Sequence, residues 1–107
     1  MENPIITIKS TSTDWKDLGM TEFEPYDRHT IKVPFRLGRM EIDTFLRIDV
    51  ETITEDTIVF RGGDYNYLYE LHKGGNAVCV THTVGGYTDH DGCDWDGTDY
   101  DYFLSWE

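Results

Sequence analysis

The chain has 107 residues, 21 acidic and 9 basic, so its formal net charge is -12 at pH 7. Hydrophobic residues make up 38% of the sequence and aromatic residues 14%, which is enough apolar material for one packed core and excludes a disordered acidic tail. A chain of this charge repels phosphate, which also excludes direct, nonspecific binding to nucleic acid or to anionic lipid. We therefore expect one acidic domain over residues 1–107.

The first predicted element is a short strand at residues 5–9, and a short helix is expected after it. The hydroxyl side chains of residues 11–13 can cap a helix over residues 13–18, and Gly19 can end it. Trp15 and Leu18 lie three positions apart and would cover one open end of a sheet.

Residues 30–50 alternate between apolar and polar side chains, which is the period of a half-buried strand. In the first stretch the apolar positions are Ile31, Val33, Phe35 and Leu37. Pro34 on the polar side indicates an edge or a bulge. The alternation continues beyond Gly38 to Val50, so the two stretches are predicted to form a hairpin with an apolar and an acidic face.

Four more strands are predicted in the rest of the chain, at residues 57–61, 65–73, 77–84 and 99–106. In the last one, Tyr100 and Tyr102 alternate with Asp99 and Asp101. The fold class is therefore mainly β: an antiparallel, meander-rich sheet of six to seven strands that could form a partly closed barrel or a sandwich, with one short N-terminal helix.

The acidic residues are unevenly distributed along the chain. Residues 74–107 contain seven acids and no Lys or Arg, a net charge of -7. Two further acidic stretches are Asp49, Glu51, Glu55 and Asp56, and Glu22, Glu24 and Asp27. Such charges repel each other and weaken a fold, although acidic surfaces also improve solubility and a charge run is commonly a solvated loop.

A long loop rich in Asp and Gly is predicted at residues 85–98, where aromatic side chains alternate with the acids. Aromatic residues beside charges are typical of protein interfaces. Asp99 and Asp101 on one strand face would lie about 6 to 7 Å apart, close to the spacing of phosphates along a nucleic-acid strand. The predicted partner-binding residues are Tyr87, Asp89, Asp91, Asp94, Trp95, Asp96, Asp99, Tyr100 and Asp101.

Metal binding is the competing interpretation of this loop. The EF-hand calcium pattern fits neither from Asp89, where position 6 is Asp94, nor from Asp94, where position 12 is Ser105. An irregular divalent-metal site built from Asp89, Asp91, Asp94 and Asp96 remains an alternative.

Zinc is a second metal alternative, with Cys79, His82, His90 and Cys93 as its ligands. A regular strand at residues 77–84 would point Cys79 and His82 to opposite faces, which argues against zinc. We predict no cofactor and reduced thiols, with a Cys79–Cys93 bridge as the alternative.

The sequence contains no recognisable catalytic motif. No serine lies in a strained elbow, and nearby carboxylates would raise a thiol pKa and disfavour the reactive thiolate. We therefore expect a protein that is not an enzyme. The N-terminus has neither a basic region nor a long apolar stretch, so we expect a cytoplasmic protein.

The predicted function is a non-enzymatic acidic inhibitor that binds the basic nucleic-acid-binding surface of a larger protein. In charge and size the chain resembles phage-encoded nucleic-acid mimics that block restriction or CRISPR effectors (anti-CRISPR proteins), which implies a basic protein partner, with neither nucleic acid nor membrane bound directly. The alternatives are an immunity protein that neutralises a nuclease toxin and a divalent-metal-binding β-domain that uses the Asp-rich loop.

Overall fold

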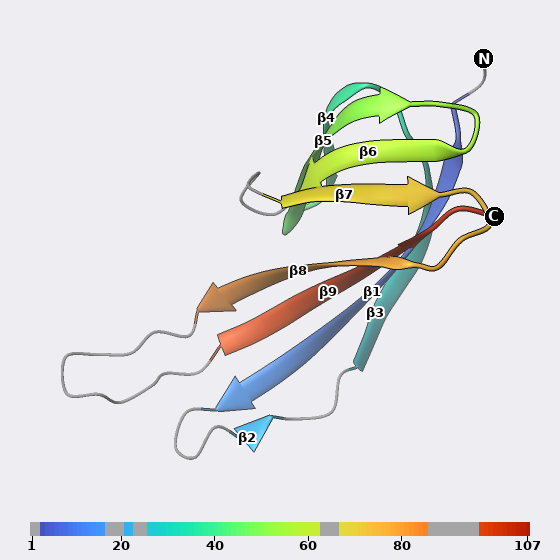
Figure 1. Cartoon of the computed structure of the whole chain (residues 1–107). Coiled ribbons are helices and arrows are strands. Elements are labelled where there is room, and N and C mark those ends of the chain that lie inside the picture. Colours follow the sequence, from blue (N-terminus) through green and yellow to red (C-terminus); the bar gives the residue numbers. More distant parts are fainter. Residues whose placement is uncertain (1–2, 17–20, 23–25, 63–66, 86–96) are drawn as a thin grey trace.

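The structure is a computed structural model that describes residues 3–16, 21–22, 26–62, 67–85 and 97–107. Two antiparallel sheets form an open sandwich (Figure 1). Sheet A has five strands: β1 (Ile5–Lys16), β2 (Thr21–Glu22), β3 (Tyr26–Pro34), β8 (Val78–Gly85) and β9 (Gly97–Ser105). Sheet B has four: β4 (Gly38–Asp43), β5 (Leu46–Ile53), β6 (Thr57–Gly62) and β7 (Tyr67–His72).

Strand β1 is central in sheet A, between β9 on one side and β3 with β2 on the other, and β8 lies outside β9. Ile8 therefore sits opposite both Ile31 of β3 and Leu104 of β9. Its neighbours on the inner side of β1, Ile6 and Ser10, are also fully buried. The first and last strands of the chain thus form the middle of this sheet.

The predicted N-terminal helix is wrong in its described part, because residues 13–16 continue β1. Thr13 pairs with Asp99 and Asp14 with Thr98, so the strand is held by β9 where the helix was expected. Capping residues are only a weak preference, and pairing along both sides of a threonine-rich strand outweighs it. Leu18 and the side chain of Trp15 lie outside the described residues.

Sheet B is an antiparallel meander in which β4, β5, β6 and β7 pair in chain order. The predicted hairpin between residues 30–37 and 40–50 is wrong, because Pro34 ends β3 and the chain crosses to sheet B before Gly38. Gly38 has a φ of 98°, a conformation that favours glycine. Phe35 is buried in this crossing, whereas Leu37 is exposed.

The stretch predicted as one strand from 40 to 50 is two strands joined by a tight turn at Thr44 and Phe45. The predicted strands at 57–61, 65–73, 77–84 and 99–106 correspond to β6, β7, β8 and β9 with shifted ends. The sequence therefore located most strands, but not the points where the chain turns.

The hydrophobic core lies between the two sheets and does not extend along all of sheet A. Phe60 of sheet B is fully buried, edge-on to Phe35 and stacked on Tyr69, with ring centroids 6.3 and 5.3 Å apart. Figure 1 shows that sheet B covers one end of sheet A, while β1, β3, β8 and β9 extend beyond it. The sheets form an open sandwich and not a closed barrel. Within the described ranges, no helix could span a membrane.

Candidate functional site

Most of the net charge is found in sequence that adjoins one end of sheet A. At that end Asp14 pairs with Thr98, Ser12 with Tyr26, and Gly85 with Gly97. We call the described residues 12–16, 26–28, 82–85 and 97–101 the acidic end. Residues 14–27 contain five acids and one base, and residues 86–101 contain six acids and no base, a net charge of -10 out of -12.

The outward face of sheet B, by contrast, has charges that compensate each other. Asp49 lies between Arg39 and Arg61 on the neighbouring strands. Arg61 also donates a hydrogen bond from Nε to Oε1 of Glu51, at 2.6 Å. The acidic stretch at residues 49–51 is therefore balanced by arginines that the sequence places far from it, and we do not count it as part of the site.

Asp99 and Asp101 lie together on the outward face of β9, as predicted, about 7 Å apart by strand geometry. Each accepts a hydrogen bond of 2.6 Å from a threonine of β8: Thr83 Oγ1 binds Asp99, and Thr81 Oγ1 binds Asp101. These hydroxyls orient the carboxylates without neutralising them. Among the side chains that the structure describes, neither Asp99 nor Asp101 has an ion-pair partner.

Tyr100 does not join these two carboxylates, although the sequence analysis grouped them. Its side chain lies on the opposite, inner face of β9 and stacks on Phe45 with ring centroids 4.1 Å apart. The other predicted partner-binding residues lie outside the described part of the chain: Tyr87, Asp89, Asp91, Asp94, Trp95 and Asp96. The described portion of the predicted site is thus one carboxylate pair.

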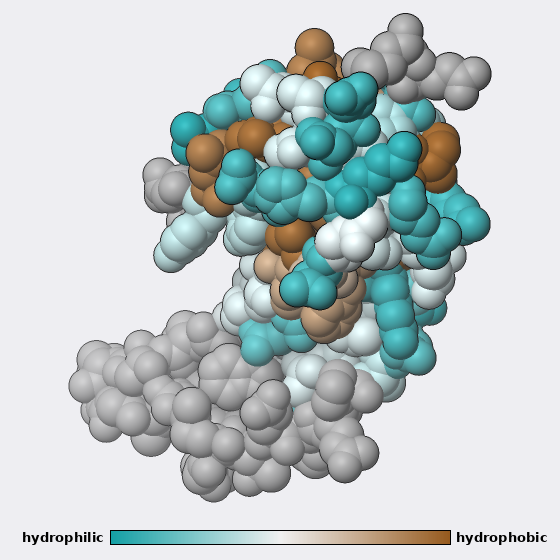
Figure 2. All heavy atoms as spheres, turned by 45° about the vertical axis from the view of Figure 1, so that its right-hand side comes forward, coloured by the Kyte–Doolittle hydropathy of each residue, from teal (hydrophilic) through white to brown (hydrophobic). Residues whose placement is uncertain are grey.

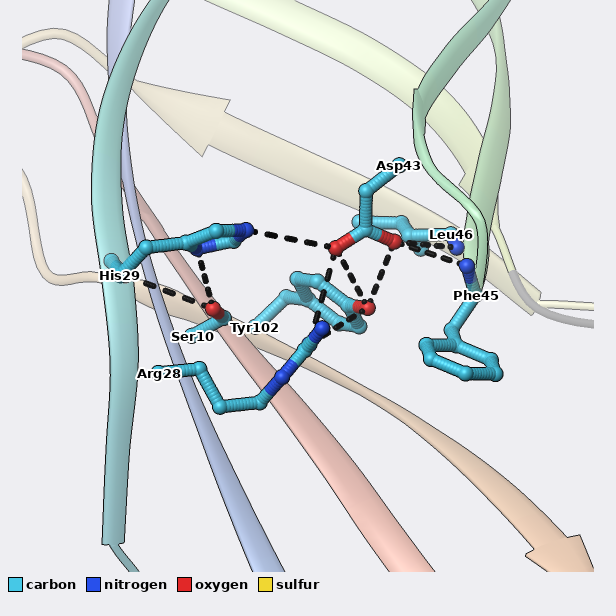
Figure 3. Close-up of polar contacts among 7 residues, drawn as sticks. All are labelled: Ser10, Arg28, His29, Asp43, Phe45, Leu46 and Tyr102. Atoms are coloured by element: carbon cyan, nitrogen blue, oxygen red, sulfur yellow. Dashed lines mark hydrogen bonds and ion pairs between the residues drawn. The ribbon is translucent and has the colours of Figure 1, made fainter.

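A polar cluster that the sequence analysis missed joins the two sheets beside the acidic end (Figure 3). At its centre is Asp43, whose side chain is 17% exposed. Asp43 Oδ1 accepts hydrogen bonds from the backbone N–H of Phe45 at 2.8 Å and of Leu46 at 3.1 Å, which forms the turn between β4 and β5. Tyr102 Oη of sheet A donates to both carboxylate oxygens, at 2.7 and 2.9 Å.

Arg28 supplies the positive charge of this cluster. Its Nη1 lies 3.6 Å from Asp43 Oδ2 and donates a 3.2 Å hydrogen bond to Tyr102. The guanidinium also lies over the rings of Tyr100 and Phe45, at 4.7 and 5.6 Å from their centroids. Burial lowers the pKa of Arg28, but the Tyr102 hydrogen bond and the neighbouring charges outweigh this effect, so its pKa is raised. Arg28 is therefore part of the set of contacts that joins the two sheets.

Ser10, His29 and Asp43 follow one another as in a hydrolytic triad, but the geometry does not suit nucleophilic catalysis. Ser10 Oγ lies 2.6 Å from His29 Nδ1, and His29 Nε2 lies 3.7 Å from Asp43 Oδ2, beyond hydrogen-bonding distance. Ser10 is fully buried. A substrate cannot reach its hydroxyl, and we interpret these contacts as structural.

The described residues also bear on the metal alternatives. Cys79 pairs with Phe103 on the outward face of sheet A, whereas His82 stacks against Phe45 on the inner face. Cys79 and His82, the first two predicted zinc ligands, therefore lie on opposite faces of the sheet. No group of three or more metal-binding side chains occurs within the described ranges. Burial, together with the charge of Asp101, raises the pKa of the Cys79 thiol against the lowering effect of Thr81. His90, Cys93 and the loop aspartates 89, 91, 94 and 96 lie outside those ranges.

The hydrogen bonds between Tyr102 and Asp43 predict that the protein loses folding stability at alkaline pH. Burial and the hydrogen bond to Asp43 raise the pKa of Tyr102 from 10.0 to about 12. The unfolded chain loses this proton first, so the stabilisation is complete below pH 10 and is lost as the pH rises to about 12. We expect Tyr102→Phe to be about 1 to 2 kcal/mol less stable at pH 7 and to lose less stability between pH 10 and 12, measured by urea unfolding. Tyr67→Phe, at an exposed ring, is the control, and equal alkaline slopes for both variants would contradict the expectation.

Comparisons of the chain with protein-family models, with curated proteins and with solved structures find no match.

Proposed function

We propose that the protein is a non-enzymatic inhibitor whose acidic end binds the basic, nucleic-acid-binding surface of a larger protein. The observation that carries the proposal is the collection of a net charge of -10 in the two segments that adjoin one end of sheet A. A folding requirement does not explain this concentration of charge along the sequence, because neighbouring like charges weaken a fold. A basic partner would relieve the repulsion on binding.

Charge is the surface feature on which the proposal rests. In the view of Figure 2 the described surface is mostly hydrophilic, with small apolar areas between polar ones. The pair Asp99 and Asp101 presents two carboxylates at about the spacing of successive phosphates. Association driven by such complementarity is fast and sensitive to salt.

Two narrower functions share this surface: a phage protein that blocks a restriction or CRISPR effector, and an immunity protein that neutralises a nuclease toxin. Both require a basic partner that loses nucleic-acid binding when the inhibitor is bound. A toxin gene beside the gene for this chain would favour immunity, and a phage genome would favour counter-defence.

The first experiment is capture of partners from a host lysate, followed by competition with duplex DNA. We expect a captured nucleic-acid-binding protein to be released by DNA and by raising salt from about 50 to about 300 mM. Asp99→Asn combined with Asp101→Asn should weaken that complex by about tenfold or more. The matched control is Glu41→Gln with Glu70→Gln, which removes two exposed acids from sheet B. If both pairs of substitutions weaken binding equally, or if DNA does not compete, the proposed site is wrong.

A further inference from the structure

Strand β8 leaves one edge of sheet A open. Among the described residues it pairs with β9 alone, through eight consecutive residue pairs from Val78 to Gly85. In an antiparallel ladder alternate residues direct their N–H and C=O groups to the other side, so β8 presents a row of backbone groups that no described strand pairs with. Figure 1 shows β8 diverging from β7 of sheet B towards the acidic end, which leaves this edge uncovered by sheet B.

The sequence of β8 has none of the features that usually protect an edge strand. The strand is VCVTHTVG, without Pro, Lys or Arg. Its outward side chains Cys79, Thr81 and Thr83 are exposed, and Val84 on the other face is 38% exposed. An eight-residue, β-branched edge of this kind is a template for an added strand.

The carboxylates of β9 determine which strand fits this edge. Thr81 and Thr83 lie between the open edge and the carboxylates of Asp101 and Asp99, to which they donate hydrogen bonds. A strand added to β8 would lie about 5 Å from it and about 10 Å from β9. A Lys or Arg side chain on the outward face of that strand is long enough to pass over a threonine and reach an aspartate.

We propose that the open edge of β8 accepts an extended basic segment of the partner as an additional strand of sheet A. Alternate Lys or Arg residues of this segment lie over Asp99 and Asp101, and the residues between them lie beside Val80 and His82. The inference rests on the proposed function for the basic nature of the partner. Strand addition supplies backbone hydrogen bonds between the two proteins, in addition to the electrostatic attraction between their surfaces.

The net charge of the chain decides against a second copy as the occupant. Each copy carries -12, and pairing β8 with β8 of another copy would join two molecules of this charge, with their Asp99 and Asp101 pairs about 15 Å apart. A basic segment relieves this repulsion, whereas a second copy adds to it.

The test uses the whole chain and a capped eight-residue peptide of alternating Lys and Val as the probe. We expect binding to slow hydrogen exchange at the outward-directed amides of β8, read residue by residue by NMR. A second peptide, N-methylated at alternate residues on the pairing edge, keeps every charge but cannot form the ladder. It should bind about tenfold or more weakly and give no protection.

A variant of β8 provides an independent readout. Thr81→Lys places a positive charge on the exposed edge strand and should weaken binding of the unmodified peptide about tenfold, whereas Thr52→Lys, at an exposed site of sheet B, should change it less than about twofold. Equal binding of the two peptides, or protection confined to other strands, overturns strand addition while leaving an electrostatic inhibitor intact. If duplex DNA does not release the captured partner in the capture experiment, the proposed function is overturned independently of strand addition. A dimer that forms through β8 without the peptide would identify a second copy as the occupant and overturn the inference.

Discussion

Replacing Asp43 with alanine should destabilise the protein by about 3 kcal/mol or more. The substitution removes the acceptor for two backbone N–H groups in the turn between β4 and β5 and for the hydroxyl of Tyr102. It also leaves Arg28 without its carboxylate in a site where the Arg28 side chain is only 22% exposed. Urea unfolding followed by tryptophan fluorescence measures the effect.

Two further variants separate the contributions of Asp43. Asp43→Asn keeps one oxygen to accept from the turn and removes the charge, so we expect a loss of about half that of alanine. Asp99→Ala, on the outward face of β9, should cost no more than about 1 kcal/mol. If Asp43→Ala and Asp99→Ala prove equally stable, the polar cluster does not hold the sheets together.

Replacing Phe60 with alanine should cost about 3 to 5 kcal/mol, because it removes a fully buried ring from the middle of the core. The ring contacts Phe35 at the crossing between the sheets and Tyr69 on β7, so the loss affects both the packing of sheet B and its attachment to sheet A. Thermal and urea unfolding both measure this loss, and the cavity should lower the melting temperature by many degrees.

The control for Phe60 is a milder change at the same position. Phe60→Leu retains most of the apolar volume and should cost less than half as much as alanine. Below its melting transition Phe60→Ala should retain partner binding, because Asp99 and Asp101 lie on the outward face of sheet A, away from the core in which Phe60 is buried. Loss of binding by a folded Phe60→Ala would show that sheet B takes part in recognition.

The period of the sequence was sufficient to predict most strands and which of their faces is buried. In β9 the alternation of Tyr102 and Leu104 with Asp101 and Phe103 predicts the inner and outer faces, and burial confirms it. Local alternation has this predictive value because side chains on a strand point alternately to the two sides of the sheet.

The same pattern could not predict how the strands pair. Residues 30–50 alternate almost without a break, yet Pro34 ends one strand in sheet A and Asp43 ends another in sheet B. Only a turn signal, an aspartate able to bind the backbone two and three residues later, marked the second break. The crossing at Phe35 depends on its burial against Phe60, a long-range contact that no local pattern contains.

The candidate site was predicted only in part for the same reason. Asp99 and Asp101 share a strand face because they are two residues apart, and this much is local. Arg28, Asp43 and Tyr102 come from three strands in two sheets, so no local pattern predicts that they meet. The pairing of β1 with β9 was not predicted either, because a helix was expected at residues 13–18. Pairing over such sequence separations is set by the whole fold.

The pairing of β1 with β9 has a consequence for synthesis of the chain. Residues 7–15 find their partners at 97–105, so the β1–β9 pairing in the middle of sheet A cannot form until residues 97–105 have left the ribosome. Contacts between such distant segments make folding slow. During that interval β3 can pair with one side of β1, and the side that β9 will cover is an unpaired edge. Residues 1–85 already contain 14 acids and 9 bases, a net charge of -5, and this charge opposes association of the open edge with other copies.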